Sequence, residues 1–230
     1  MCTLTYVPNG EGGIITANRD ETPLRNAKSL SQYYSQKGEQ FRIAREPIHG
    51  GTNLAIGNEF TTILLNGAFH SHERRINYSR SRGLIVLDSL ESESLKHLEE
   101  EELKGVEPFT LVRFGNVIEI LRWDENKVHY HIHDNEEPFL VASAQLYSDE
   151  VRMKRELWFS DLLRSGASSP LDLWEFHHQG GDGDIQNDLV MNRNGMVCTV
   201  SITQIHRQRN SQYIRHHNIP DDVHESLVIH

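Results

Sequence analysis

The stretch CTLTYVPNGEGGIITANRDE (2–21) decides the fold assignment, because it places two β-rich runs around a turn. The runs cover residues 2–7 (CTLTYV) and 13–18 (GIITAN), and the sequence NGEGG (9–13) lies between them. Asn-Gly between strand-forming residues is a strong local signal for a hairpin. The sequence therefore predicts an antiparallel hairpin whose first strand begins at Cys2.

Beyond this hairpin, blocks of expected strands alternate with blocks of expected helices. Helical patterns cover 77–104, 149–164 and 172–178. The first pattern fits one helix or two, because Ser92-Glu93-Ser94 could cap a second helix. The apolar side of the second pattern is expected to be Val151, Leu157, Trp158, Leu162 and Leu163. Strands are expected at 52–57, 60–65, 109–114, 117–122, 127–133, 138–143, 189–192 and 195–205, the last two joined by a turn at Asn194-Gly195.

Helices grouped in this way argue against a doubly wound parallel sheet. They favour an α+β fold of antiparallel sheets with helices packed outside them. A four-layer αββα sandwich fits the order, although periodicity does not select it over other α+β arrangements. The sequence shows no internal repeat, low-complexity tract or Pro/Gly-rich linker, so we predict a single domain over residues 1–230.

The composition limits the class of partner. The net charge of -10 disfavours electrostatic binding to nucleic acid or to an anionic membrane. No apolar run reaches the length needed to span a bilayer, and the N-terminus lacks a signal-peptide pattern, so a cytoplasmic location is expected. In that reducing environment Cys2 and Cys198 should be thiols. The small second residue also predicts removal of Met1, which would leave Cys2 at the N-terminus.

The end of the predicted hairpin carries a family signature. The tetrapeptide Asn18-Arg19-Asp20-Glu21, together with the Met-Cys start, resembles the NRDE family, also called the transport and Golgi organisation protein 2 family. Further matching segments follow in order at 50–52 (GGT), 64–66 (LLN), 81–83 (SRG), 109–112 (FTLV) and 199–202 (TVSI). We therefore identify the chain as a member of this family by resemblance.

The resemblance implies a fold and a chemistry. The family is distantly similar to cysteine N-terminal-nucleophile hydrolases such as choloylglycine hydrolase and penicillin V acylase, which have the αββα sandwich and hydrolyse linear amides. By analogy Cys2 would be the nucleophile, with its own α-amino group as the base. Arg19 would favour the thiolate, and Asp20 would hold the α-ammonium group. Asn66 would donate to the oxyanion, a contribution of about 3 kcal/mol.

Four further residues are candidates for substrate contacts. Asn18 opens the tetrapeptide. Ser143 or Gln145 occupies the position where the family typically has a second Asn, and Arg193 is the nearest candidate for a late Arg of the hydrolases. Glu21 is less easily placed and is expected to end the strand.

A structural interpretation stands beside this catalytic one. A cysteine in a strand is most often a small buried hydrophobic residue, and Arg19 with Asp20 would then form an ion pair that holds the hairpin. The presence of Arg19, Asp20 and Asn66 together brings the two interpretations close to even, and both stay open.

The other polar clusters indicate no cofactor and no metal. His129, His131 and His133 share one strand face, where a solvent-facing strand is favoured over a zinc site because the side chains spread too far apart. The remaining candidates have incidental or structural interpretations: the pairs His177-His178 and His216-His217, the turn Asp182-Gly183-Asp184, and Cys198 as a buried thiol.

Two functions follow from the sequence. The first is a cysteine amidohydrolase or acyl-transfer enzyme that cleaves a non-peptide linear amide through Cys2. The alternative is a non-catalytic binding or trafficking protein that uses the same pocket for a lipid, acyl-thioester or haem-type ligand. In both, the partner is a small molecule.

Overall fold

The computed structural model describes residues 2–10, 12–75, 77–209 and 211–230. The chain forms two compact units. The first contains the residues up to Ser29, together with Glu136–Ala142 and Tyr147–His230. The second contains Leu30–Asn135 and Ser143–Leu146. The chain therefore crosses between the units several times, and each unit is built from segments distant in sequence.

The first unit is built on a mostly antiparallel sheet with the strand order β10-β1-β2-β12-β13-β14, and β11 pairs with β12. Both faces of β1 and β2 are buried almost throughout. The strands are β1 (Cys2–Pro8), β2 (Gly13–Glu21), β10 (Phe139–Ala142), β11 (Asn192–Arg193), β12 (Val197–Gln208), β13 (Ser211–Asn218) and β14 (Val223–Ile229).

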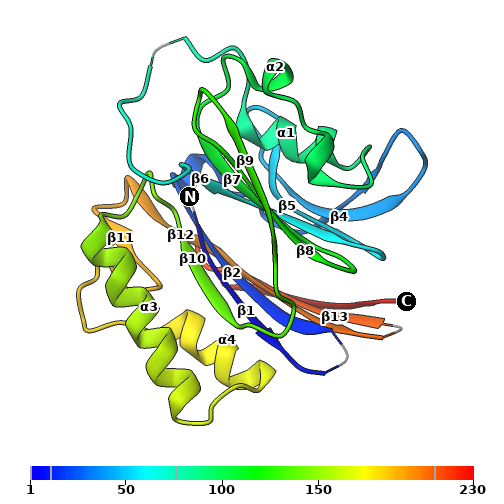
Figure 1. The fold of residues 1–230 in the computed structure, drawn as a ribbon. Helices are drawn as coiled ribbons and strands as arrows, with labels where there is room; N and C mark the ends of the chain where they lie inside the picture. Colours follow the sequence, from blue (N-terminus) through cyan, green and yellow to red (C-terminus); the bar gives the residue numbers. More distant parts are fainter. Residues whose placement is uncertain (1, 11, 76, 210) are drawn as a thin grey trace. The chain divides into compact units, whose positions relative to one another are not determined.

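Two helices, α3 (Asp149–Arg164) and α4 (Pro170–Gln179), cover one face of this sheet (Figure 1). Both begin at a capping serine: Ser148 accepts from the Val151 N–H, and Ser169 accepts from the Asp172 N–H. Such caps satisfy N–H groups that the first helical turn leaves without an intrahelical acceptor. A short 3-10 helix, Pro23–Arg25, follows β2.

The second unit has a meandering antiparallel sheet, β3 to β9 in sequence order. Its strands are β3 (Ser31–Tyr34), β4 (Gln40–Arg45), β5 (Thr52–Gly57), β6 (Thr61–Asn66), β7 (Phe109–Phe114), β8 (Ile118–Trp123) and β9 (Val128–His133). The helical segments are α1 (Arg82–Ser89), a 3-10 helix (Leu95–His97) and α2 (Glu100–Leu103). Helix α1 packs on β5 and β6, and the apolar core lies between these helical segments and the sheet.

The observed elements confirm the predicted class: a mixed chain with two largely antiparallel sheets and helices in blocks. The predicted limits of β5, β7 and α3 match. The predicted turn at Asn194-Gly195 is present, with positive φ at both residues, and the pairing of Arg193 with Val197 makes it a three-residue connection. The predicted strand at 189–192 was wrong, since only Asn192 of that range is in β11. The long helical pattern at 77–104 is broken into three short segments, and β3, β4, β13 and β14 were missed.

The buried side of α3 agrees with most of the expectation. Four of the five expected residues are half-buried, namely Val151, Trp158, Leu162 and Leu163, whereas Leu157 is exposed. The buried residues of the helix are Arg155 and Phe159. The Arg155 guanidinium stacks 3.7 Å from the centre of the Tyr147 ring and donates to the carbonyl oxygens of Asn187 and Asp188. A charged residue with these partners occupies the centre of the buried face, which apolar periodicity does not reveal. No helix in the described ranges is long and apolar enough to cross a membrane.

Candidate functional site

Cys2 and Arg19 are direct neighbours across the first hairpin. They are Cα partners in the antiparallel register of β1 and β2, and both side chains are buried. Directly opposite residues in antiparallel strands project to the same face of a sheet, with Cβ atoms about 4.5–5.5 Å apart. The face that carries Cys2 and Arg19 is called the Cys2 face below.

Glu21 belongs to the same face, because it follows Arg19 by two residues along β2. Its carboxylate accepts from the Thr22 N–H at 2.9 Å and pairs with Arg25 at 3.1 Å. Burial works to raise the pKa of Glu21, but the charges of Arg25 and Arg19 and the Thr22 N–H hold it below its ordinary value. Glu21 is thus a buried carboxylate that stays ionised. It lies two residues beyond Arg19 along β2, past the first residue of β1.

Asp20, expected beside Cys2, projects to the opposite, helix-covered face. Its carboxylate accepts from the Tyr147 hydroxyl at 2.6 Å and from the Thr199 hydroxyl at 2.6 Å. Burial raises the pKa of Asp20, although Arg155 and the two hydroxyl donors act against the rise. Strand alternation explains the correction: neighbouring residues of one strand cannot share a face, so Arg19 and Asp20 separate.

Asn18 is also on the helix-covered face and is used for structure. Its amide donates to the carbonyl oxygens of His177 (2.9 Å) and Leu189 (2.7 Å). Its Oδ1 accepts from the His177 ring at 2.5 Å. Because these bonds employ both ends of a fully buried amide, the expected substrate contact of Asn18 is replaced by a link between β2 and α4.

Other polar side chains extend the Cys2 face across β12 and β13. Ser201 is the Cα partner of Arg19, and Cys198 is the partner of Glu21. His216 and Thr203 are also partners, and the Thr203 hydroxyl and His216 Nδ1 are 2.8 Å apart. Burial, reinforced by His217 and Arg19, lowers the pKa of His216 to about 4. The imidazole is therefore neutral near pH 7, and the face combines two thiols, hydroxyls, a cation and a carboxylate.

Asn66 ends strand β6 in the second unit. Its backbone carbonyl accepts from the Ser143 hydroxyl at 2.7 Å and from the Gln145 N–H at 3.3 Å. Its side-chain amide makes no hydrogen bond to another described residue. The next residue, Gly67, has a φ of +86°, and a Cβ there would meet the Gln145 nitrogen at 2.6 Å. The backbone of Asn66 is therefore held in place, while the N–H groups of its side-chain amide are not used by another described residue.

Ser143 and Gln145 support this strand end. Beyond the bonds to Asn66, the Gln145 amide accepts from the His72 N–H and donates to the His72 carbonyl, both at 2.9 Å. The Gln145 side chain thus makes two hydrogen bonds to the backbone of His72, in the segment that follows β6, in the manner of a neighbouring strand. Both residues hold Asn66 in place, whereas the sequence had suggested substrate contacts.

Arg193 lies in the first unit, in β11. Its guanidinium donates to the Gln186 carbonyl and to Asn187 Oδ1, and it lies 5.5 Å from the centre of the Tyr147 ring. Because Tyr147 bonds Asp20 on the helix-covered face, Arg193 belongs to that network. The structure thus groups the candidates into the pair Cys2 and Arg19, a helix-side network containing Asn18, Asp20 and Arg193, and the strand end at Asn66.

Sequence reasoning missed Glu21, Ser201 and His216. Glu21 would have been found from strand parity alone, since it is two residues from Arg19. Ser201 and His216 required the register of β12 and β13, which the sequence did not reveal. Both cysteines are thiols, as expected. The His129, His131 and His133 face is largely exposed, in agreement with the solvent-facing interpretation. The predicted removal of Met1 falls outside the described residues.

No model of a known protein family matches the chain, and a search of curated proteins finds no match. The resemblance to the NRDE family therefore rests on the motifs.

Proposed function

We propose that the protein is a cysteine amidohydrolase or acyl-transfer enzyme of the N-terminal-nucleophile type, acting on a non-peptide linear amide. The observation that carries the proposal is the placement of Cys2 opposite Arg19 on a buried face that also holds Glu21. The proposal includes the four-layer αββα sandwich, the removal of Met1 and the participation of Asn66.

The roles differ in one respect from those implied by the resemblance. Glu21, rather than Asp20, has the position to hold the α-ammonium group of an N-terminal Cys2, because it shares the Cys2 face and stays ionised. Arg19 favours the thiolate of Cys2 by its positive charge. Asp20 acts indirectly by fixing β2 through Tyr147 and Thr199.

The reaction balances with these groups. The α-amine of Cys2 takes the thiol proton, and the sulfur attacks the amide carbonyl, whose oxygen becomes negative and accepts from the Asn66 amide. Collapse breaks the C–N bond, and the α-ammonium returns the proton to the leaving amine. Water then attacks the thioester, and the α-amine accepts a proton from the water. The C–S bond breaks and releases the carboxylic acid, and the α-ammonium returns the proton to the Cys2 sulfur. In acyl transfer an acceptor amine replaces water.

A panel of chromogenic N-acyl amides with acyl chains of different length tests the reaction. We expect a burst of released amine equal to the enzyme concentration, followed by slower turnover, in wild type. Cys2→Ala should abolish both phases. Cys198→Ala is the matched control, because it removes the other thiol of the same face and should keep the burst. Hydrolysis that survives in Cys2→Ala would refute Cys2 as the nucleophile.

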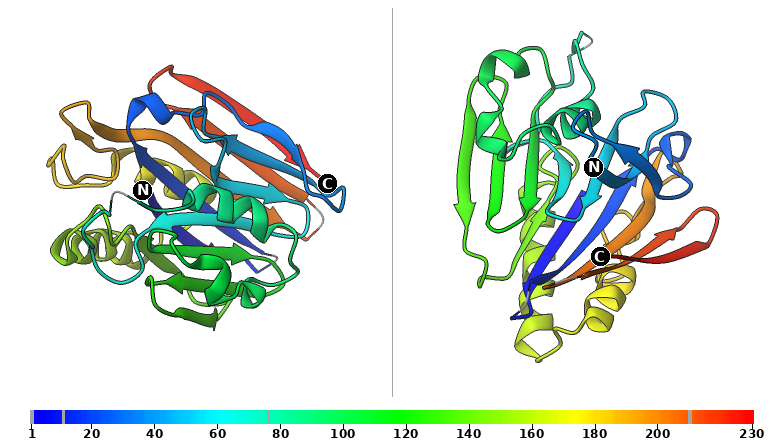
Figure 2. Two further views of the ribbon diagram at one scale, coloured as in Figure 1. Left: turned by 90° about the horizontal axis from the view of Figure 1, so that it is seen from above. Right: turned by 90° about the vertical axis from the view of Figure 1, so that its right-hand side faces the viewer.

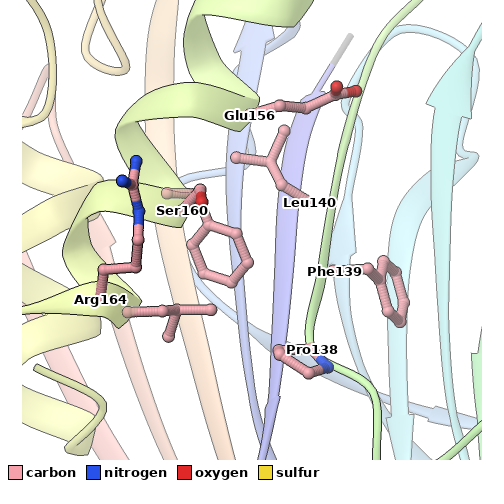
Figure 3. A pocket seen from close by; sticks show the side chains of 8 residues that line it. Pro138, Phe139, Leu140, Glu156, Ser160 and Arg164 are labelled. Atoms are coloured by element: carbon pink, nitrogen blue, oxygen red, sulfur yellow. The ribbon is translucent and has the colours of Figure 1, made fainter. Parts of the chain in front are cut away.

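A second candidate function, binding of an apolar ligand, is favoured by one feature of the first unit. A pocket of about 490 Å³ lies between β10 and α3, lined by Pro138, Phe139, Leu140, Glu156, Phe159, Ser160, Leu163 and Arg164 (Figure 3). Aromatic and aliphatic walls with a few polar groups are typical of small-molecule sites of this size. Arg164 provides a cation for a carboxylate or thioester-linked headgroup.

The two functions predict different variant effects. If ligand binding is the function, Ser160→Trp should block uptake of a fluorescent fatty acid, while Cys2→Ala should leave uptake unchanged. Glu150→Gln, an exposed change on α3 outside the pocket, is the control. Uptake that is unaffected by Ser160→Trp would exclude this pocket as the ligand site.

A further inference from the structure

The hairpin of β13 and β14 lies at one edge of the first unit's sheet (Figure 2, orange to red). It carries a cluster of imidazoles. His217 and His224 are Cα partners across this hairpin. Asp222 lies in the connecting turn, with a φ of +50°. The hairpin therefore presents two imidazoles and a carboxylate from adjacent positions.

The distances suit a single metal ion. The Asp222 Oδ1 atom is 3.2 Å from His217 Nε2 and 3.6 Å from His224 Nε2. One ligand atom from each of the three residues lies within 4.8 Å of the others. Ligands about 2.0–2.2 Å from a tetrahedral zinc ion are separated by roughly 3.3–3.6 Å. The His217 and His224 rings stack with centroids 3.9 Å apart and 15° between their planes, so the exposed His224 ring would rotate out of the stack to share a metal with the other two residues.

A chain of hydrogen bonds leaves a lone pair of His217 facing Asp222. The Trp174 carbonyl can only accept, so His178 Nδ1, 2.8 Å away, carries the hydrogen. In a neutral ring His178 Nε2 then accepts, and its 2.9 Å contact with His217 Nδ1 requires the hydrogen on the latter. His217 Nε2 is consequently an acceptor and meets the acceptor oxygen of Asp222.

Two acceptors in contact require a cation between them, either a proton or a metal. The lone pair of His217 Nε2 and the carboxylate of Asp222 face the same point, and a ligand atom of His224 lies within 4.8 Å of both. A metal ion at this point would satisfy all three acceptors.

We propose that His217, Asp222 and His224 bind one divalent transition-metal ion, for which Zn²⁺ is the probe, and that His178 positions the His217 ring. Two imidazole nitrogens and one carboxylate oxygen are ligands that zinc, copper and nickel share. A ligating histidine usually donates its other ring N–H to a neighbouring acceptor, and the bond from His217 to His178 fills this role.

The site is separate from the proposed catalytic residues. His217 follows His216 in β13, so it projects to the helix-covered face, where His178 of α4 contacts it. Cys2, Arg19 and His216 belong to the opposite face. The metal would link the edge hairpin to α4 through His178, and its binding does not depend on the proposed hydrolase activity.

Zinc titration against a chromophoric competing chelator at pH 7.5 tests the proposal. We expect one saturable site in wild-type protein. Asp222→Asn and His224→Gln should each weaken binding at least tenfold. Both positions are exposed, and Asn tolerates the positive φ at 222, so neither change should disturb folding. His178→Leu should weaken binding about 10–100-fold, while His178→Gln, which can still accept from His217, should weaken it less.

The matched control is His129→Gln. His129 pairs with Asp124 at 2.7 Å on an exposed strand, but no third ligand joins this pair among the described residues. This variant should bind zinc as wild type does. Absence of a saturable site in wild type would overturn the proposal. So would equal affinities in wild type, Asp222→Asn and His224→Gln, because binding would then lie elsewhere on this histidine-rich chain.

Discussion

Cys2 and Arg19 face each other across the first hairpin, while Asp20, the next residue in the chain, projects through the sheet to Tyr147 and Thr199. Successive residues of the tetrapeptide 18–21 therefore lie on opposite faces of the sheet. Arg19 and Glu21 share the Cys2 face, whereas on the other face Asn18 bonds His177 of α4 and Asp20 bonds Tyr147 and Thr199. The division follows from strand alternation and leads to the predictions below.

Glu21→Gln and Asp20→Asn should differ in their effect on the rate of thiol acylation. Glu21→Gln removes the carboxylate on the Cys2 face and should reduce the rate of thiol acylation at neutral pH. It also removes the charge that pairs with Arg25, so some stability should be lost as well. Asp20→Asn replaces the acceptor for two buried hydroxyl groups and should lower the free energy of unfolding by about 1–3 kcal/mol while sparing the acylation rate per folded molecule. Stopped-flow acylation and urea denaturation measure the two effects. A larger acylation defect in Asp20→Asn would contradict the proposed assignment of Glu21.

Gly67→Ala should destabilise the strand end that carries Asn66. The added Cβ would lie 2.6 Å from the Gln145 nitrogen, a backbone atom that cannot move without breaking its bond to Asn66. Gly38→Ala is the matched control: its φ of +84° resembles the +86° of Gly67, but nothing lies within 4 Å of the new Cβ. Both changes carry the cost of a left-handed residue, about 1–2 kcal/mol. Thermal unfolding should show a clearly larger loss for Gly67→Ala, and equal losses would argue against this contact.

His177 should make the protein less stable in mild acid. The fully buried ring donates from Nδ1 to Asn18 and accepts from the Thr5 hydroxyl at Nε2, so it is held neutral, and burial lowers its pKa to about 3. The unfolded chain protonates this ring near pH 6.5, so it binds more protons than the folded chain at lower pH. Stability from this residue is complete above pH 6.5 and is lost as the pH falls towards 3.

The loss should reach about 1.4 kcal/mol between pH 8 and pH 5.5. Urea denaturation across this range, in wild type and His177→Gln, measures it. The variant lacks the titrating ring, so its stability should fall less steeply than that of wild type. Identical slopes would mean that His177 is not held neutral in the folded chain.

The sequence predicted the first hairpin and the second unit's central strands because their side chains are apolar and their turns carry Asn or Gly. It failed at β13, where the buried positions hold Gln212, Ile214, His216 and Asn218. Burial alternates there as in any strand, but mostly polar side chains occupy the buried positions, so hydrophobic periodicity gives no signal. The edge strands β3 and β14 are partly exposed and carry little signal either.

The site was predicted in part. The resemblance assigned Arg19 to the environment of Cys2, and the register of β1 and β2 makes the two residues direct partners. The resemblance assigned Asp20 to the α-ammonium group because of its place in the motif. Residues two apart along a strand share a face, however, so Glu21 and not Asp20 lies on the face of Arg19. The partners of Gln145 and His217 come from distant segments, and a single sequence contains no record of such contacts.

The central claim is that Cys2 is the reactive thiol. Brief treatment with limiting iodoacetamide at pH 7.5, followed by intact mass and peptide mapping, tests it most directly. Exposure alone favours Cys198, because Cys2 is fully buried and Cys198 is partly exposed. Burial and the charge of Asp20, however, raise the pKa of Cys198 and slow its reaction. We predict a mass without Met1 and a single adduct on Cys2. Retained Met1, or an adduct confined to Cys198, would contradict the account.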